Sequence, residues 1–261
     1  MGCLSCAGFV KGMAGTATRL VLRDHSDRHI GAECLNPEFL AGRNAKEISS
    51  LQIRMDGETG SLGDVFFIEP GLTEHVVLEG DLSRVHDIGK SMRHGTLTVQ
   101  GNVGDRLGAG MQGGVITVEG SAGDNAGAEM NGGTLLIKGH AGTKLGSAMR
   151  RGMVAVQGDT GDCPGDAMED GTIFVFGRLG NRAGAGNRRG TIVAHGPVGA
   201  MLPTYMPSCT YASMRLSQAC AWLRERGFSI PGDLESGIYL RHRGDMNMNG
   251  KGEILVFCKS Q

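Results

Sequence analysis

The stretch GNVGDRLGAGMQGGVITVEGSAGDNAGAEMNGGTLLIKG (101–139) contains two consecutive copies of one 19-residue unit. Gly101 returns at this period as Gly120 and Gly139, and the period continues to Gly196. Further glycines lie three, seven and thirteen residues after the first glycine of most units. A fixed period near 20 residues is typical of a solenoid, in which each unit buries its apolar face only against its neighbours. The middle of the chain therefore predicts a stack of coils.

Each unit ends in a five-residue segment that is rich in β-branched residues and bounded by glycine, a pattern typical of a strand. The second and fourth residues of these segments are apolar, from Leu97 and Val99 to Ile192 and Ala194, so they are expected on one face. Equivalent strands with the same orientation must be parallel, and the glycine-rich segments between them have little helical period. We therefore predict an all-β protein, a parallel β-helix with 19-residue coils that rise by about 4.8 Å each.

A column of methionines follows the same period. It contains Met92, Met111, Met130, Met149 and Met168, and Asn187 interrupts it. Such a column can bind copper or line a binding groove, but in a solenoid we expect an internal ladder that fills an irregular gap.

Four segments follow from these patterns. We expect a leader at 1–18, an N-terminal cap at 19–61, the β-helix at 62–201, and a C-terminal helix and tail at 202–261. LGDVFFIEPG (62–71) is interpreted as an aberrant early coil strand. Apolar residues at helical spacing predict a helix from about 212 to 223, with Gly227 as its C-cap. Residues 239–245 and 250–257 are predicted as edge strands.

Composition excludes several classes of function. The formal net charge is −1, which does not favour nucleic acid as a partner, and no apolar run approaches the 18 residues of a membrane span. The seven cysteines are odd in number and scattered, so we expect free thiols in a reducing cytoplasm. Cys3 and Cys6 form a lone CxxC that lacks the partner ligands of a structural zinc site.

No catalytic constellation is present, and we assign no catalytic or metal-binding residue. GDRLGAG (104–110) resembles a phosphate loop, but it recurs in each coil and precedes strands. Asp105 and Asp124 share a coil position, but the next coil places Thr143 there, which does not fit a calcium-binding roll.

One polar feature suggests binding. Arg150 and Arg151 occupy the same coil position as Arg188 and Arg189 two coils later, with Glu169–Asp170 between the two pairs. One interpretation is a solvated turn of alternating charge. The other is a docking strip for an acidic partner surface or a polyanionic ligand.

The repeat GxxGxxxGxxMxxG resembles the C subunits of formylmethanofuran dehydrogenase and of the bacterial formyltransferase/hydrolase complex, and more distantly the C-terminal β-helix of glutamate synthase. The similarity includes AGRNAKEISSLQI (41–53), GDLSRVHDIGKSM (80–92) and LPTYMPS (202–208). The tail RHRGDMNMNGKGEILV (241–256) is more similar to the bacterial complex.

This resemblance implies a right-handed parallel β-helix and a non-catalytic scaffold subunit within a larger complex of one-carbon metabolism. In that complex the formyl group passes between tetrahydromethanopterin and a furan-type carrier and leaves as formate. The neighbouring subunits, chiefly an amidohydrolase-type catalytic subunit, would hold the metal and both reaction sites, so this chain alone is expected to bind no cofactor. Two alternatives stay open: a subunit of a molybdenum or tungsten formylmethanofuran dehydrogenase, and a stand-alone β-helix acyltransferase.

Overall fold

A computed structural model of the protein describes residues 17–23, 28–212, 214–230 and 237–258. The predicted leader, with Cys3 and Cys6, lies outside these ranges except for its last two residues, and Thr18 already belongs to the first strand.

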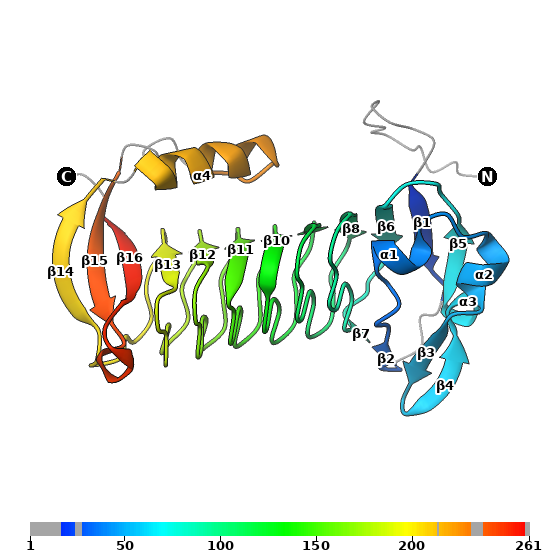
Figure 1. The fold of residues 1–261 in the computed structure, drawn as a ribbon, viewed down its shortest axis with the longest axis horizontal. Coiled ribbons are helices and arrows are strands. Elements are labelled where there is room, and N and C mark those ends of the chain that lie inside the picture. Colours follow the sequence, from blue (N-terminus) through cyan, green and yellow to red (C-terminus); the bar gives the residue numbers. More distant parts are fainter. Residues whose placement is uncertain (1–16, 24–27, 213, 231–236, 259–261) are drawn as a thin grey trace, which may run out of the picture.

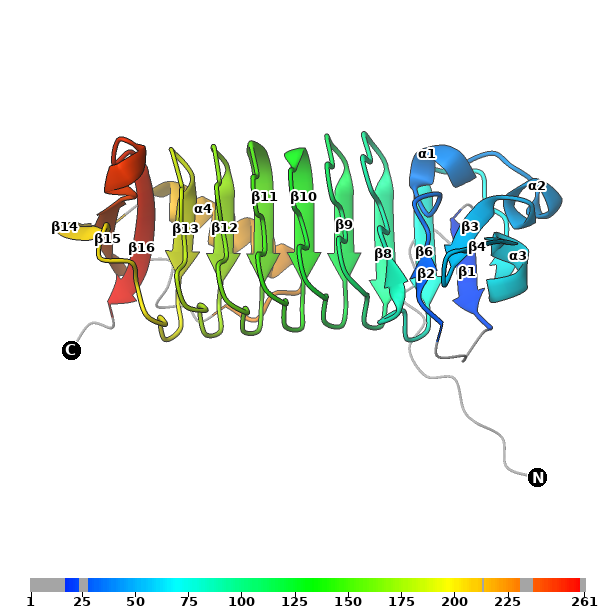
Figure 2. The same cartoon turned by 90° about the horizontal axis from the view of Figure 1, so that it is seen from below.

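The centre of the molecule is a rod of stacked coils (Figure 1). Each coil contributes one strand to a common parallel sheet, and the turns between strands run along the opposite side (Figure 2). The coil strands are β6 (His75–Glu79), β8 (Thr96–Gln100), β9 (Val115–Val118), β10 (Asn131–Ile137), β11 (Arg151–Val156), β12 (Thr172–Val175) and β13 (Thr191–Ala194). Leu97, Ile116 and Leu135 are direct neighbours across β8, β9 and β10, which is the predicted 19-residue register. The parallel β-helix is therefore confirmed.

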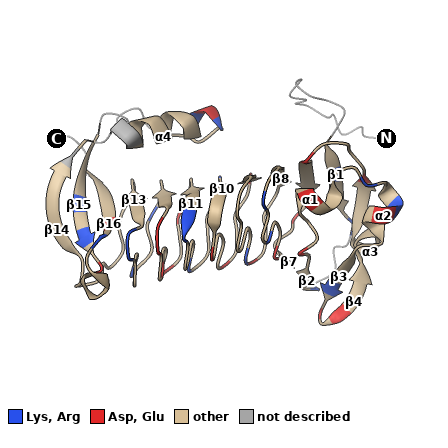
Figure 3. Ribbon diagram, viewed as in Figure 1, with Lys and Arg blue, Asp and Glu red and all other residues tan. Residues whose placement is uncertain are grey.

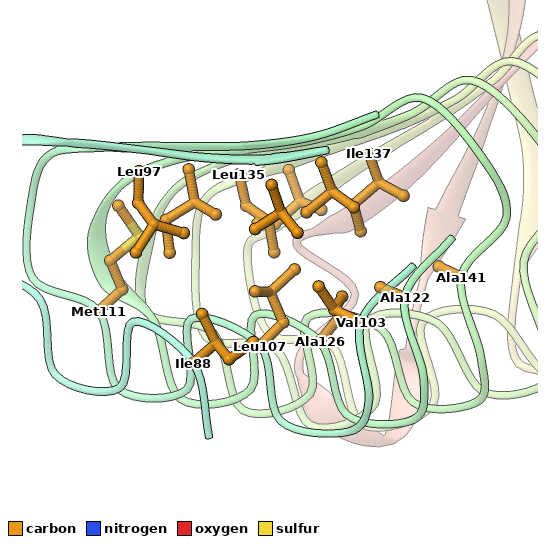
Figure 4. Packing of buried hydrophobic residues seen from close by; sticks show 14 of the residues in the cluster. Ile88, Leu97, Val103, Leu107, Met111, Ala122, Ala126, Leu135, Ile137 and Ala141 are labelled. Atoms are coloured by element: carbon orange, nitrogen blue, oxygen red, sulfur yellow. The ribbon is translucent and has the colours of Figure 1, made fainter. Parts of the chain in front are cut away.

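The core lies between the sheet and the opposite wall of the rod. The second and fourth residues of the five-residue segments, including Leu97, Leu135 and Ile137, are fully buried. They point toward side chains such as Leu107 and Ala122 from the other wall (Figure 4). Short parallel bridges, for example between Val103 and Ala122, hold that wall together. The two inward columns predicted from the alternation are confirmed.

The recurring glycines have two different causes. At the position of Gly108, seven residues into the unit, the backbone has a positive φ of 62°, which glycine adopts without strain. At the position of Gly120, a Cβ atom would lie only 2.5 Å from the carbonyl oxygen of Gly101 in the preceding coil. The glycine that sets the period is thus required by close stacking of the coils.

The methionine column is an internal ladder, as expected. Its five members, from Met92 to Met168, are fully buried in the core. Asn187 continues the column and is also fully buried. Its amide exchanges two hydrogen bonds with the backbone of Gly190, at 2.9 and 2.8 Å, which satisfies its polar groups at the end of the rod.

The N-terminal part contains short elements around the first coil. They are β1 (Thr18–Leu22), β2 (Ile30–Gly31), α1 (Pro37–Leu40), α2 (Ala45–Ser49), β3 (Gln52–Met55), β4 (Glu58–Ser61), α3 (Leu62–Val65), β5 (Phe66–Glu69) and β7 (Val85–His86). β1 pairs parallel with β6 and so extends the coil sheet, whereas β5 pairs antiparallel with β1 at the edge. The interpretation of 62–71 as a coil strand is therefore wrong. Residues 62–65 form a helical turn instead, and the Asp64 carboxylate caps it by accepting a hydrogen bond from the backbone N–H of Ser61.

The C-terminal part adds the last strands to the sheet and covers one of its faces. It consists of β14 (Met206–Tyr211), α4 (Met214–Glu225), β15 (Ile238–Gly244), the 3₁₀ turn η2 (Met246–Met248) and β16 (Gly252–Cys258). The helix is confirmed, and Gly227 follows it with a φ of 83°. The strands at 239–245 and 250–257 also exist, but neither is an edge strand. β16 pairs parallel with β13, β15 follows it, and β14 forms the edge.

α4 lies along the outward face of the sheet (Figure 1). A second apolar cluster fills the space between them and includes Phe174 and Val193 from the sheet and Cys220 and Leu223 from α4. No helix in the described ranges is both long enough and apolar enough to span a bilayer.

Candidate functional site

The acidic residues of the coil turns serve the stack. The Asp105 carboxylate accepts the backbone N–H of Asp124 at 2.8 Å, and Asp124 accepts that of Thr143 at 2.7 Å. A second ladder runs from Asn102 through Ser121 in the same way. These oxygens hold adjacent coils together. In the described ranges, no group of three or more His, Cys, Asp or Glu side chains is arranged to hold a metal ion.

In the rod, the charged residues lie mainly in the turns (Figure 3). The structure brings the four predicted arginines into one column, since the strands that follow them keep the 19-residue register, with Met153 paired to Thr172 and Thr172 to Thr191. All four arginines are exposed. The Nε atom of Arg150 lies 3.8 Å from the Glu169 carboxylate, so the first pair is partly neutralised by the acidic residues that follow it.

Lys251 extends this column by one further level. Glu253 of β16 pairs with Thr191 of β13, and Lys251 and Arg189, each two residues before this pair, line the same hollow. The sequence interpretation missed this lysine. The signal was present, because KGEILV (251–256) repeats the pattern of RGTIVA (189–194), so β16 replaces a coil strand at the end of the rod.

The end of this column borders a hollow of about 380 Å³. Its lining consists of Glu169, Arg188, Arg189, Asn247, Met248, Asn249 and Lys251. Among the residues that the structure describes, Arg188, Arg189 and Lys251 form no ion pair, while Glu169 is already paired with Arg150. The hollow therefore carries an excess of positive charge and offers two neutral amides as additional hydrogen-bonding groups.

Buried Asp245 holds the rim of the hollow in place. Its side chain accepts the backbone N–H of Asn247 at 3.0 Å and that of Gly186 at 3.3 Å. Its carbonyl oxygen accepts from Met248 and Gly250, at 2.8 and 3.0 Å. Asp245 thus fixes η2 against the last regular coil.

Tyr205 supports the same end of the rod. Its hydroxyl donates to the carbonyl oxygen of Gly184 at 2.9 Å, and burial raises the pKa of Tyr205 to about 12. The tyrosine therefore stays neutral and supports the coil that carries Arg188 and Arg189. The site is a cationic surface suited to binding an anion.

Comparison with known proteins shows which family this β-helix belongs to. No family model matches the chain. A chain in the crystal structure of the formyltransferase/hydrolase complex (FhcABCD) from Methylorubrum extorquens with methylofuran has a TM-score of 0.75 and 32% sequence identity. The match covers 91% of this chain and 98% of that chain. The fold over nearly the whole length is therefore that of a β-helical component of an enzyme complex.

Curated relatives agree with this class. The C subunit of the formyltransferase/hydrolase complex Fhc of M. extorquens is 36% identical over 73 residues, 28% of each chain. The C subunit of the tungsten-containing formylmethanofuran dehydrogenase 2 of Methanothermobacter wolfeii is 32% identical over 95 residues, 34% of this chain and 35% of that protein. The matched segments thus span about a third or less of these curated relatives. The chain belongs to the family formed by the C subunits of formyltransferase/hydrolase complexes and formylmethanofuran dehydrogenases.

Proposed function

We propose that this chain is a non-catalytic scaffold subunit of a cytoplasmic formyltransferase/hydrolase complex. The observation that carries the proposal is the structural match to a chain of such a complex, which covers 91% of this chain and 98% of that one. None of the five cysteines in the described ranges forms a disulfide, which fits a reducing compartment.

In this proposal the chemistry takes place on other subunits. They transfer the formyl group between tetrahydromethanopterin and a furan-type carrier and release it as formate. An amidohydrolase-type subunit holds the metal. The β-helix supplies a long rigid flank, because each coil is fixed by backbone ladders and by a continuous aliphatic core. Such a flank suits an extended interface and can hold two catalytic subunits at a constant distance.

A molybdenum or tungsten dehydrogenase is the second candidate for the parent complex. It is favoured by the similarity to archaeal C subunits, one of which is 35% identical over 79 residues, although this segment is only 20% of that relative. The match to a solved chain of the hydrolytic complex covers 91% of this chain and 98% of that one, which supports the hydrolytic role. Purification of the intact complex distinguishes the two, since only the dehydrogenase contains molybdenum or tungsten detectable by elemental analysis.

The scaffold role is tested by assaying the isolated chain for hydrolysis of the formylated furan carrier. We expect no turnover until the partner subunits are added, and turnover by the chain alone would refute the role. The stand-alone acyltransferase is tested by titration with an acyl-CoA. Binding would revive that alternative. The coils of β-helical acyltransferases are built from hexapeptides and have 18 residues, whereas the coils of this chain have 19.

A further inference from the structure

The cationic hollow lies beside unusually exposed apolar side chains. Met246 and Met248 in η2 are 58% and 38% exposed, and Met206 at the start of β14 is 58% exposed. The backbone N–H of Met246 donates to the carbonyl oxygen of Thr204, which holds η2 beside the segment that leads into β14. Exposed methionines and the cations of the hollow therefore share one end of the rod.

This combination is characteristic of a protein interface. Arg and Met are enriched at protein–protein contacts, and flexible methionine side chains adapt to a partner surface. A site for a small polyanion needs the cations but gains nothing from exposed methionines around them. The cations also follow the rod axis at successive levels, so they fit an extended row of carboxylates better than a single anionic group.

We propose that the hollow formed by Arg188, Arg189, Lys251 and η2 is the docking site for an acidic segment of a partner subunit. The inference rests on the proposed function, which supplies the partner. Carboxylates of that segment pair with the three cations, the amides of Asn247 and Asn249 donate hydrogen bonds, and the partner's apolar side chains cover Met246 and Met248. Charge complementarity fixes the partner's register along the rod.

The test compares three full-length chains, each co-expressed with the other subunits of the complex and captured through a tag on one of those subunits. One is the wild type. The second carries Arg188→Glu, Arg189→Glu and Lys251→Glu, and the matched control carries Arg150→Glu and Arg151→Glu on the same column outside the hollow. The amount of chain retained is measured against salt concentration.

We expect the triple variant to lose about tenfold or more in retention at low salt, because like charges across an interface are unfavourable. The control should stay within about twofold of the wild type, since exposed ion pairs contribute little individually. Equal retention of the wild type and the triple variant, or equal loss in the control, would overturn the docking site. Failure of the wild type itself to be retained would instead refute the proposed function.

Two further measurements identify the occupant. A photo-cross-linking residue in place of Met248 should join the chain, in the assembled complex, to a partner segment rich in Asp and Glu. Cross-links to a second copy of this chain, or to a segment without carboxylates, would contradict the proposal. Tight binding of tetraglutamate that the triple variant abolishes while assembly is unchanged would assign the site to a small polyanion instead.

Discussion

Thr117 and Phe174 occupy the same outward column of the sheet, three coils apart, yet their environments are opposite. Register across β9 to β12 aligns Thr117 with Leu136, Ala155 and Phe174. Phe174 is only 2% exposed because α4 covers it, whereas Thr117 lies beyond α4 and is half-buried. From β6 to β13 the coil sheet is therefore buried throughout on its inward face, whereas its outward face is buried only from β10 to β13.

The first prediction concerns the inward face. Val118→Asp places an unpaired charge among fully buried aliphatic side chains and should destabilise the protein by several kcal/mol or prevent folding. Thr117→Asp, one residue earlier, should change the free energy of unfolding by less than about 1 kcal/mol. Urea unfolding followed by circular dichroism measures both variants. Equal losses would contradict the assignment of the two faces.

The second prediction concerns the part of the outward sheet face that α4 covers. Phe174→Ala should cost about 3–5 kcal/mol, as expected for truncation of a buried aromatic side chain. Thr117→Ala in the same column provides the matched control and should be nearly neutral. A loss of less than about 1 kcal/mol for Phe174→Ala in thermal or urea unfolding would mean that α4 does not pack on the sheet in solution.

Close stacking of the coils gives the third prediction. Gly120→Ala would place a methyl group 2.5 Å from the Gly101 carbonyl oxygen, so the coils must separate locally at a cost of about 1–3 kcal/mol. Gly31 is the control, because a Cβ there meets nothing closer than 3.7 Å. Gly31→Ala should leave the unfolding midpoint unchanged or slightly raised. A neutral Gly120→Ala would refute the stacking explanation for the 19-residue period.

The fourth prediction is a pH dependence at His195. Its ring stacks on Phe176 with centroids 4.6 Å apart, and burial lowers the pKa of His195 to about 4. The unfolded chain therefore takes up this proton near pH 6.5, before the folded chain does, so stability falls as the pH falls from 6.5 to 4. The full shift corresponds to about 3 kcal/mol at most.

His195→Phe keeps an aromatic ring at this position and removes the titration. Its unfolding free energy should fall less steeply between pH 6.5 and 4 than that of the wild type. Some dependence should persist, because burial also lowers the pKa of His75. Parallel pH profiles for the two proteins would show that His195 does not contribute.

The coil architecture could be predicted from the sequence because the repeat is local and strict. The alternation around Val118 and the methionine column each determine burial without knowledge of distant contacts. The N- and C-terminal parts were harder. The apolar pattern of Phe66–Glu69 predicts a strand but does not specify its direction. In the structure this strand, β5, pairs antiparallel with β1 and is not a coil strand.

Only the arginines of the candidate site could be predicted from the sequence. Periodicity alone aligned Arg151 with Arg189, but Lys251 joins them through a strand that returns after β14, α4 and β15. The similarity of KGEILV to RGTIVA was the available signal. Likewise, the change from Thr98 and Thr117 to Leu136 and Phe174 in the outward column already marked where a helix covers the sheet.

The central claim is that this chain is a structural component of a formyltransferase/hydrolase complex, and purification of the tagged chain from its native cell tests it most directly. Mass spectrometry and a turnover assay should then be applied to the purified sample. The account predicts a stable assembly of fixed stoichiometry that contains catalytic subunits and hydrolyses the formylated furan carrier, whereas the chain separated from them is inactive. Isolation of the chain alone, or activity that stays with it after separation, would contradict the account.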